Sequence, residues 1–472
     1  MADTDAYPPL ELGAYTQPVT TKSVEAQEWF DRGWVWTSAY HREEAAFCFA
    51  QAAEADPKCA MAHWGIALAH GPDYNFHAAV GFYDFASQVE GWPSINVAVA
   101  AITKAKALTE ELVLPAREKA LIDAMAARYE WPVTAQTAGL QEAYATAMEQ
   151  AALEHPGDAD IQAVCCEALL VLSPWDLYER PEGGAFWRSE GRTLLPVGER
   201  AQRTCSRGLA ADPGHVWLCH LKIHLCEMGP VSAIDWAAAD ALRRSDARGC
   251  GHLLHMPSHV DIQVGEYARA TADNMMAYEA DMRLHSLLPS RWTIYTGYLV
   301  HNLEFAAWAA MLGGARVASL SAAEKLDAFV SEEKLRANPV TAMLFESYLS
   351  TRLMVLVRFG LWTDILATPF KQDRALHLAH TLFLHFARAL ALGARCELEA
   401  ATEEQVVATR SARRSTPDPI RHAHRTTRYR TTPHATAPLH MAPAPYHTPP
   451  APHRVPTPPY SSPSHPRHTP HP

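Results

Sequence analysis

Two histidine pairs in the sequence have a spacing that could bind a metal ion. His220 and His224 form one H-x-x-x-H pair, and His255 and His259 form another. Residues four apart lie on the same face of an α-helix, so each pair could present two imidazoles to one ion. Neutral imidazole is the commonest protein ligand for transition metals. Three or four such ligands make a zinc, iron or copper site, and the four histidines are therefore candidate ligands for one divalent transition-metal ion.

A regular offset relates the two pairs. His255 follows His220 by 35 residues, and His259 follows His224 by the same number. In a helical-repeat protein, an offset of one repeat places equivalent residues side by side on neighbouring helices. The spacing therefore predicts that both pairs face one cavity.

Other residues near the pairs are candidates for binding a ligand or for acid–base chemistry. His252 lies three residues before the second pair, and Glu227 lies three residues after the first. His301 is a further candidate, in a segment with helical periodicity. Trp175 lies in a long stretch, from Ser173 to about Pro196, that has no clear helical periodicity. Loops this long inside compact arrays are often functional.

The elements that position these residues are predicted to be helices. Ala, Leu and Glu dominate the chain before residue 411, and runs of β-branched residues bounded by turns are missing. Pro115 is typical of a helix start, and His41 is expected at a turn or cap between two helices. Ser321 and Glu324 have the spacing of a capping box, which predicts a helix start there. The body of the protein is therefore predicted to be all-α.

A repeat pattern of 34 residues is clearest near the N-terminus. In this pattern small residues lie where two helices touch, aromatic residues fill the space between them, and proline ends the second helix. The residues that match this tetratricopeptide pattern are Trp29, Gly33, Trp36, Ala45, Phe49, Ala52 and Pro57. Weaker copies are marked by Ala151 and Pro156, by Gly265, Tyr267 and Ala270, by Gly314 and Ala318, and by residues 359–362. The pattern predicts an N-terminal arm over 1–21 and a curved helical-repeat array, an α-solenoid, over 22–405.

The repeat phase places the histidines on one side of the array. With Pro213 and Ala270 as reference positions, both pairs fall at positions 5 and 9 of successive first helices. In tetratricopeptide repeats, these positions line the concave groove. Pro257 lies inside the second pair, and its missing N–H predicts a kink or a new helix start at that point.

The C-terminal residues 411–472 have a different composition. They contain 16 of the 34 Pro and 9 of the 25 His, together with many Thr and eight Arg, but neither Phe nor Trp. Such a segment cannot bury enough apolar surface to offset the entropy of ordering it. We therefore expect a disordered Pro-, His- and Thr-rich tail.

Charge and composition exclude several classes of protein. The net charge is −11 and the body is more acidic than the tail, so we expect no nucleic-acid binding. No apolar run approaches 18 residues, so no membrane span is expected. The acidic, proline-broken N-terminus does not resemble a secretory signal. Nine Cys without a Cys-x-x-Cys pair indicate a reducing compartment, and we expect the protein to be cytoplasmic.

Several segments also carry a family resemblance. The matching stretches are Trp29–Tyr74, Ser173–Leu177, Asp212–Glu227, His301-Asn302 and the segment from Gly251 through His252-Leu-Leu-His-Met-Pro-Ser-His259 to Gly265. Through them the sequence resembles a family of bacterial and fungal tetratricopeptide repeat proteins, of which the His-Met-Pro-Ser-His segment is more distinctive than the repeat itself. The resemblance implies a helical-repeat fold with a histidine-bearing groove. It implies no particular reaction, and the tail departs from the family after about residue 400.

Two functions remain open on the sequence alone. The first is a scaffold that binds a peptide or small molecule in the histidine-lined groove and does no chemistry. The second is a metal-dependent enzyme that uses zinc, iron or copper, with the two pairs as ligands and with His252, Glu227 or His301 as a further ligand or an acid–base group. The fold alone does not decide between them.

Overall fold

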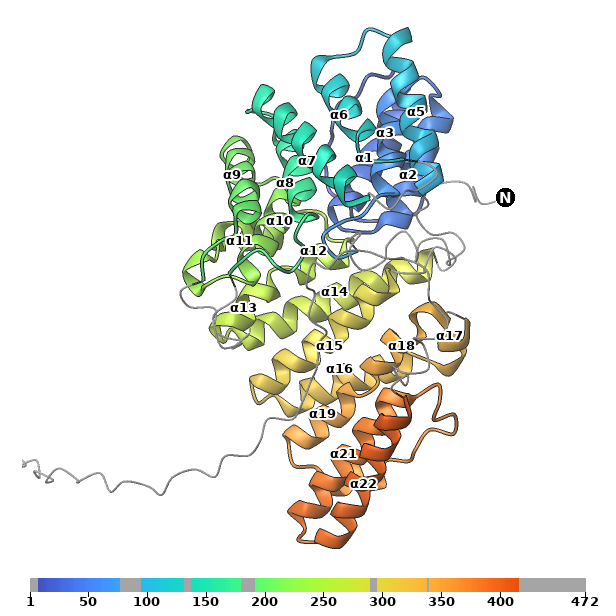
Figure 1. Ribbon diagram of the computed structural model, residues 1–472, viewed down its shortest axis with the longest axis vertical. Coiled ribbons are helices and arrows are strands. Elements are labelled where there is room, and N and C mark those ends of the chain that lie inside the picture. The colour runs from blue at the N-terminus through green and yellow to red at the C-terminus, as the bar shows by residue number, and fades with distance from the viewer. Residues whose placement is uncertain are drawn as a thin grey trace, which may run out of the picture. The chain divides into compact units, whose positions relative to one another are not determined.

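The computed structural model describes residues 7–76, 95–130, 137–179, 192–288, 295–337 and 339–415 (Figure 1). Within these ranges there is no β-strand. The regular structure is α-helix, with the short 3₁₀ helix η2 (Val231–Ala233) and one isolated bridge between Tyr178 and Leu194. The prediction of an all-α helical-repeat array is therefore confirmed.

The first half of the array precedes the second histidine pair. Its helices are α1 (Val24–Ser38), α2 (Arg42–Ala55), α3 (Ala60–Ala69), α5 (Ile95–Glu111), α6 (Ala116–Ala126), α7 (Thr137–Glu154), α8 (Ala159–Leu170), α9 (Pro196–Ala211), α10 (Val216–Glu227) and α11 (Trp236–Arg244).

The second half contains both long and short helices. Its helices are α12 (Gly251–His255), α13 (Ser258–Val264), α14 (Tyr267–Leu287), α15 (Thr296–Leu312), α16 (Arg316–Phe329), α17 (Glu332–Ala337), α18 (Pro339–Tyr348), α19 (Thr351–Arg358), α20 (Trp362–Ala367), α21 (Leu378–Ala394) and α22 (Leu398–Ser415).

Consecutive helices pack against each other along the array, as Figure 1 shows for α14, α15 and α16. The first pair, α1 and α2, has the packing that the repeat pattern predicts. A Cβ on Gly33 would lie 2.7 Å from Cδ1 of Phe49, so glycine is the residue that lets the aromatic ring fill the contact. Gly33 and Phe49 are both buried in the contact between the two helices. A small residue facing an aromatic ring gives the close helix packing of a tetratricopeptide-like repeat.

Left-handed glycines end several of the helices. Gly265, Gly314 and Gly360 have φ values of +84°, +73° and +65° and lie at the turns after α13, α15 and α19. Residues other than glycine adopt this conformation at a cost, which explains the glycines at these turns. The capping box predicted at Ser321 is wrong, because the turn at Gly314 already starts α16 at Arg316.

The N-terminal arm contacts helices that are distant in sequence. The backbone N–H of Gly249 donates to the carbonyl of Glu11 at 2.6 Å, and the hydroxyl of Tyr15 donates to the carboxylate of Asp160. The hydroxyl of Tyr7 donates to Glu44 at 2.9 Å. The arm therefore joins α2, α8 and the segment before α12.

The C-terminal helix continues to the end of the described residues. Helix α22 ends at Ser415, so the backbone is still helical at residue 411, where the sequence predicts the tail to begin. Residues 398–415 are rich in Ala, Glu and Arg, which favour helix, and the first proline beyond them is Pro417. The rest of the predicted tail, 416–472, lies outside the described residues.

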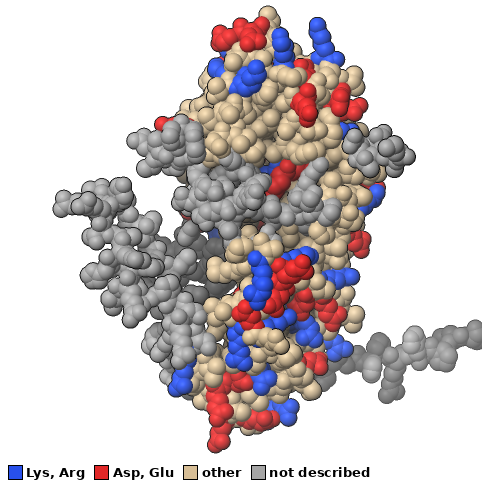
Figure 2. Space-filling model, turned by 90° about the vertical axis from the view of Figure 1, so that its right-hand side faces the viewer, with Lys and Arg blue, Asp and Glu red and all other residues tan. Residues whose placement is uncertain are grey.

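Charged side chains on one face are mixed in sign. Figure 2 shows Lys and Arg interspersed with Asp and Glu over the lower part of that face, without an extended basic surface among the described residues there. None of the described helices is long and apolar enough to cross a membrane.

Candidate metal centre

Helix α10 carries the first histidine pair and is almost entirely buried. Its N-cap is His215, whose Nδ1 accepts from the N–H of Leu218 at 3.2 Å and whose Nε2 lies 3.0 Å from Asp160 Oδ1. The cap fixes where the helix begins. His220 and His224 then lie one turn apart on one face, and their side chains are 0% and 1% exposed.

The second pair lies on two short helices that meet at a proline. Helix α12 ends at His255 and α13 begins at Ser258, so the predicted interruption at Pro257 is confirmed. Proline has no N–H for the helical ladder, which accounts for the break. Buried Asp261 anchors α13, because it accepts from Arg269 at 2.6 Å and also pairs with Arg243 on α11.

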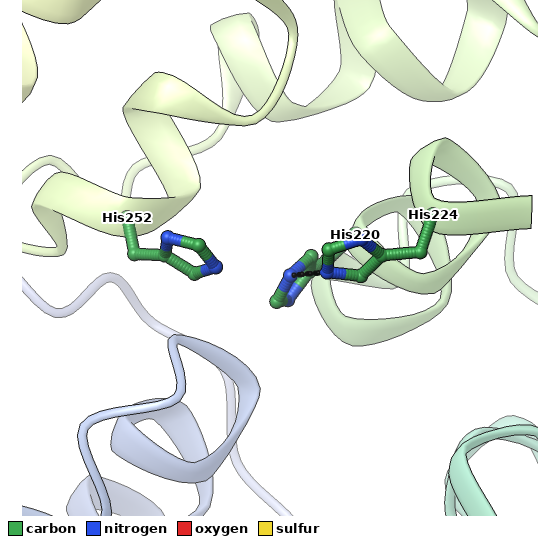
Figure 3. Close-up of side chains that lie close together, drawn as sticks. All are labelled: His220, His224 and His252. Carbon is green, nitrogen blue, oxygen red and sulfur yellow. Dashed lines mark hydrogen bonds between the residues drawn. The ribbon is translucent and has the colours of Figure 1, made fainter. Parts of the chain in front are cut away.

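Three histidines form a group that we call the inner triad: His220, His224 and His252. One ring nitrogen from each lies within 4.8 Å of the others. Figure 3 shows His252 extending from α12 toward the pair on α10. The Nε2 atoms of His220 and His224 are 3.0 Å apart.

Three more histidines form a group that we call the outer triad: His255, His259 and His301. Their ligand nitrogens also lie within 4.8 Å of one another. The Nε2 atoms of His255 and His259 are 2.8 Å apart, and His301 comes from α15, with its ring centroid 4.8 Å from that of His255.

The four histidines that the sequence suggests for a single ion therefore divide between two triads. Each triad takes one H-x-x-x-H pair and adds one residue, His252 or His301, from the further candidates. Two nitrogens bound to one ion at about 2.0–2.1 Å lie at most about 4.2 Å apart. The separations within the pairs, 3.0 Å and 2.8 Å, are inside this limit, whereas the nitrogens of each whole triad are spread over up to 4.8 Å, so the third ring must move toward the pair to share its ion.

An oxygen acceptor holds the Nδ1 atom of each paired histidine. These contacts are His220 to the carbonyl of Ser38 at 2.7 Å, His224 to Glu227 Oε1 at 2.6 Å, His255 to Asn274 Oδ1 at 2.6 Å and His259 to Glu227 Oε2 at 2.8 Å. The orientation of the Asn274 amide follows from its other bond, in which Nδ2 donates to Ala270 O at 2.8 Å. Carbonyl and carboxylate oxygens only accept, so each Nδ1 carries a proton.

This arrangement leaves the two Nε2 atoms of each pair with lone pairs that face each other. A neutral imidazole with a proton on Nδ1 has none on Nε2. At 3.0 Å and 2.8 Å, opposed lone pairs repel unless a cation lies between them. A metal ion or an extra proton would supply that cation, and burial disfavours an extra proton on His220 and His255.

Burial affects the charge of each group. It lowers the pKa of His220, His252 and His255 well below the ordinary value, and the neighbouring histidines lower the pKa further. Burial of Glu227 opposes ionisation, but the adjacent rings of His259 and His224 outweigh it and lower the pKa of this carboxyl to about 2. The site therefore places an ionised carboxylate beside three imidazoles, those of His220, His252 and His255, whose charged form burial disfavours.

His252 has an unusual lack of hydrogen bonds. Its side chain is 1% exposed, and neither ring nitrogen has a hydrogen-bond partner among the described residues. Burying an imidazole without partners costs free energy, and such a group needs an explanation. A metal ion in the inner triad would satisfy one of the two nitrogens.

Aromatic side chains that sequence reasoning missed surround the inner triad. The ring of Tyr40 lies 4.4 Å from that of His220, Tyr74 lies 4.6 Å from His224 and Tyr298 lies 4.3 Å from His252. They come from segments far from α10 in sequence, and no periodic pattern marks them. The predicted turn residue His41, by contrast, is confirmed as the N-cap of α2.

Two strained residues lie beside His224. Tyr40 and Trp175 have φ values of +58° and +60°, a left-handed conformation that bulky residues rarely adopt. The ring of Trp175 lies 6.0 Å from that of His224, and the backbone N–H of Trp175 donates to the hydroxyl of Tyr74 at 3.1 Å. Strain of this kind clusters at functional sites. The strain therefore marks the surroundings of His224 as a place of functional interest.

Two buried networks hold the surrounding rings in place. Arg42 pairs with Asp73, whose Oδ1 accepts from two backbone N–H groups of the loop that carries Tyr74. Tyr295 accepts from the backbone N–H of His252 at 3.3 Å and donates to Asp281 at 3.0 Å.

The candidate residues differ in their access to solvent. The inner triad is 0–1% exposed, so these imidazoles do not lie on an open surface. The side chains of His259 and His301 are 16% and 30% exposed, and Trp175 is 40% exposed.

No protein-family model matches the sequence, and no curated protein matches it. Among solved structures, the chain is similar to the crystal structure of the TPR domain of P58(IPK), with 11% identity and a TM-score of 0.19, over 84% of this chain and 100% of that chain.

Proposed function

We propose that the protein binds two transition-metal ions, one in each histidine triad, and uses them in metal-dependent chemistry. The observation that carries the proposal is the opposed lone pairs, since four imidazoles are held with Nδ1 protonated and with their Nε2 atoms paired at 2.8 Å and 3.0 Å. The shared carboxylate of Glu227 supports it. A carboxylate behind a histidine ligand orients the ring and increases its basicity, as in carboxylate–histidine–metal arrangements.

The donor set supports zinc, iron or copper. Imidazole nitrogen suits these ions, whereas magnesium and calcium prefer oxygen ligands. Three protein ligands leave a coordination position for water or substrate, as in catalytic zinc sites. The His-Met-Pro-Ser-His segment contributes two ligands to the proposed outer ion, and His252, three residues before it, contributes one to the inner ion.

Binding of a peptide or small ligand by the repeat array is the second candidate function. It is supported by the helical-repeat fold, whose stacked helices offer extended surfaces to partners, and by the exposed ring of Trp175 beside His224. An acidic ligand, however, would need charged imidazoles, and burial keeps His220, His252 and His255 neutral.

Elemental analysis of the purified chain after loading and desalting tests the proposal. We expect about two ions per chain, one lost with His220→Ala plus His224→Ala and the other with His255→Ala plus His259→Ala. His215→Asn is the matched control, because it alters a buried histidine on the same helix outside both triads. Less than half an ion in the parent chain with zinc, iron and copper alike would overturn the proposal and leave ligand binding as the function.

A further inference from the structure

The two triads differ in their contact with solvent. His220, His224 and His252 of the inner triad are 0%, 1% and 1% exposed. In the outer triad only His255 is fully buried, while the side chains of His259 and His301 are 16% and 30% exposed.

Packed side chains close the inner triad. A tyrosine ring lies against each of its imidazoles, and these rings belong to Tyr40, Tyr74 and Tyr298. All three tyrosines are 7% exposed or less. An ion at this site would therefore be enclosed by protein on the sides that these rings occupy.

The outer triad has a more open environment. Phe305 packs 5.2 Å from the rings of His255 and His259 and 5.7 Å from His301. On the same helix, Glu304 Oε2 lies 3.7 Å from His301 Nδ1. The outer triad is thus exposed to solvent at His259 and His301, and the Glu304 carboxylate lies beside His301.

We propose that the outer ion is the reactive one, which binds water or a small anion at an open coordination position, while the inner ion is closed to exogenous ligands. The inference rests on the proposed function, namely that both triads hold ions. Structural metal sites are closed and catalytic sites keep an open position, and the difference in exposure assigns the two roles. Imidazole ligands bring no negative charge into direct contact with a divalent ion, so the open position can take an anionic ligand such as hydroxide.

The experiment uses the full chain loaded with copper(II), desalted, and titrated with azide. Charge-transfer absorption of a copper–azide complex reports binding. We expect one azide per chain, with loss of binding in His301→Ala and retention in His252→Ala. His301 lies on the surface of α15, so its replacement leaves the core of the array in place.

A second measurement needs no variant. With a chelator in excess, we expect one ion to leave the wild-type chain at least about tenfold faster than the other, because release from a closed site waits for a local opening. Azide should slow the loss of the fast ion only.

The outcomes separate the inference from the proposed function. Four results would each overturn the assignment of the outer ion. They are binding of two azides per chain, azide binding that survives His301→Ala, azide binding that is lost with His252→Ala, and equal rates of loss for the two ions. A wild-type chain that retains no copper after desalting would overturn the proposed function itself.

Discussion

Glu227 connects the two triads through its two carboxylate oxygens. One oxygen accepts from Nδ1 of His224 at 2.6 Å and the other from Nδ1 of His259 at 2.8 Å. One carboxylate therefore accepts from one histidine in each triad. If both triads hold ions, this single buried group would couple them.

Glu227→Gln should weaken metal binding by about 10–100-fold for at least one of the ions, the usual cost of losing such a partner. A glutamine can accept from one imidazole only, and its NH₂ group would face the Nδ1 proton of the other. Competition with a chelator of known affinity measures the change. Glu118→Gln is the control, since this buried carboxyl accepts from Thr20 through one oxygen, which an amide reproduces. Affinities within twofold of wild type would contradict the bridging role.

Asp281 should make the stability of the metal-free protein depend on pH. Burial raises the pKa of this carboxyl to about 8, whereas its value in the unfolded chain is near 3.8. Between about pH 4 and pH 8 the unfolded state releases the proton and the folded state retains it. The free energy of unfolding should therefore fall as pH rises through this range. Each unit by which the pKa differs between the folded and unfolded states changes this free energy by about 1.4 kcal/mol.

Asp281→Asn removes this ionisation and should gain stability relative to wild type as pH rises from 5 to 8. Urea unfolding in the presence of a chelator measures the difference, which we expect to reach on the order of a few kcal/mol. Parallel pH profiles of the two proteins would show that Asp281 does not keep its proton in the folded state.

Residue types and spacing were sufficient to find all six histidines and Glu227, but not their division into two groups. The 35-residue offset predicts adjacent helices, but it does not give the rotation of each helix about its axis. The break at Pro257 and the positions of His252 and His301 decide which rings meet. The tyrosines could not be found, because they come from the turn after α1, the loop after α3 and α15, and are brought to the site by tertiary packing alone.

At the scale of elements, the contact between α12 and α14 sets the position of His252 and His255. A Cβ on Gly251 would lie 2.7 Å from the carbonyl of Ala277 and would also collide with the Asp281 carboxylate. A backbone oxygen cannot move aside as a flexible side chain can. Helix α12 depends on glycine for its distance from α14.

Gly251→Ala should lower the free energy of unfolding by about 1–3 kcal/mol and weaken metal binding in both triads, because it shifts α12. Gly139→Ala in α7 is the matched control, since a Cβ there meets nothing within 4 Å. That replacement should stabilise the protein by about 0.5–1 kcal/mol through helix propensity. Thermal denaturation measures the stability of both variants, and chelator competition measures their metal affinity. Unchanged metal affinity in Gly251→Ala would contradict the role of Gly251 in positioning α12.

The success of the repeat pattern and the failure of the capping box have a common cause. Gly33 and Phe49 are constrained by contact between two helices, so their types carry tertiary information. Ser321 and Glu324 match a local motif only, and the turn at Gly314 had already set the start of α16. Patterns that encode packing were therefore more reliable than a single local signal.

At the scale of the whole molecule, metal ions would hold together helices that are far apart in sequence. The ligands come from α10, α12, α13 and α15. Removal of the ions with a chelator should lower the melting temperature by several degrees, since an ion that binds only the folded state stabilises it by about 2.7 kcal/mol at 100 times its Kd. The His224→Ala, His259→Ala double variant should not respond to the chelator. An equal response of both proteins would contradict the prediction.

Truncation after Ser415 should leave the melting temperature of the remaining chain nearly unchanged, within about 2 °C. The removed residues are rich in proline and lack Phe and Trp, so they offer little to a core. The number of tightly bound ions should also stay the same, although nine histidines are removed. A loss of bound ions on truncation would place a ligand in the tail.

The contact between Ser38 and His220 spans 182 residues, and that between Asn75 and Tyr298 spans 223. In an ordinary solenoid each repeat touches only its neighbours, so repeats can be duplicated or lost during evolution with little effect on the others. Here an extra repeat between α3 and α10 would move Ser38, at the end of α1, away from His220, with which it is in contact. These contacts therefore constrain the number of repeats between residues 38 and 298. Gain or loss of repeats after α15 would leave them in place, and from α15 onward the core divides into smaller separate clusters.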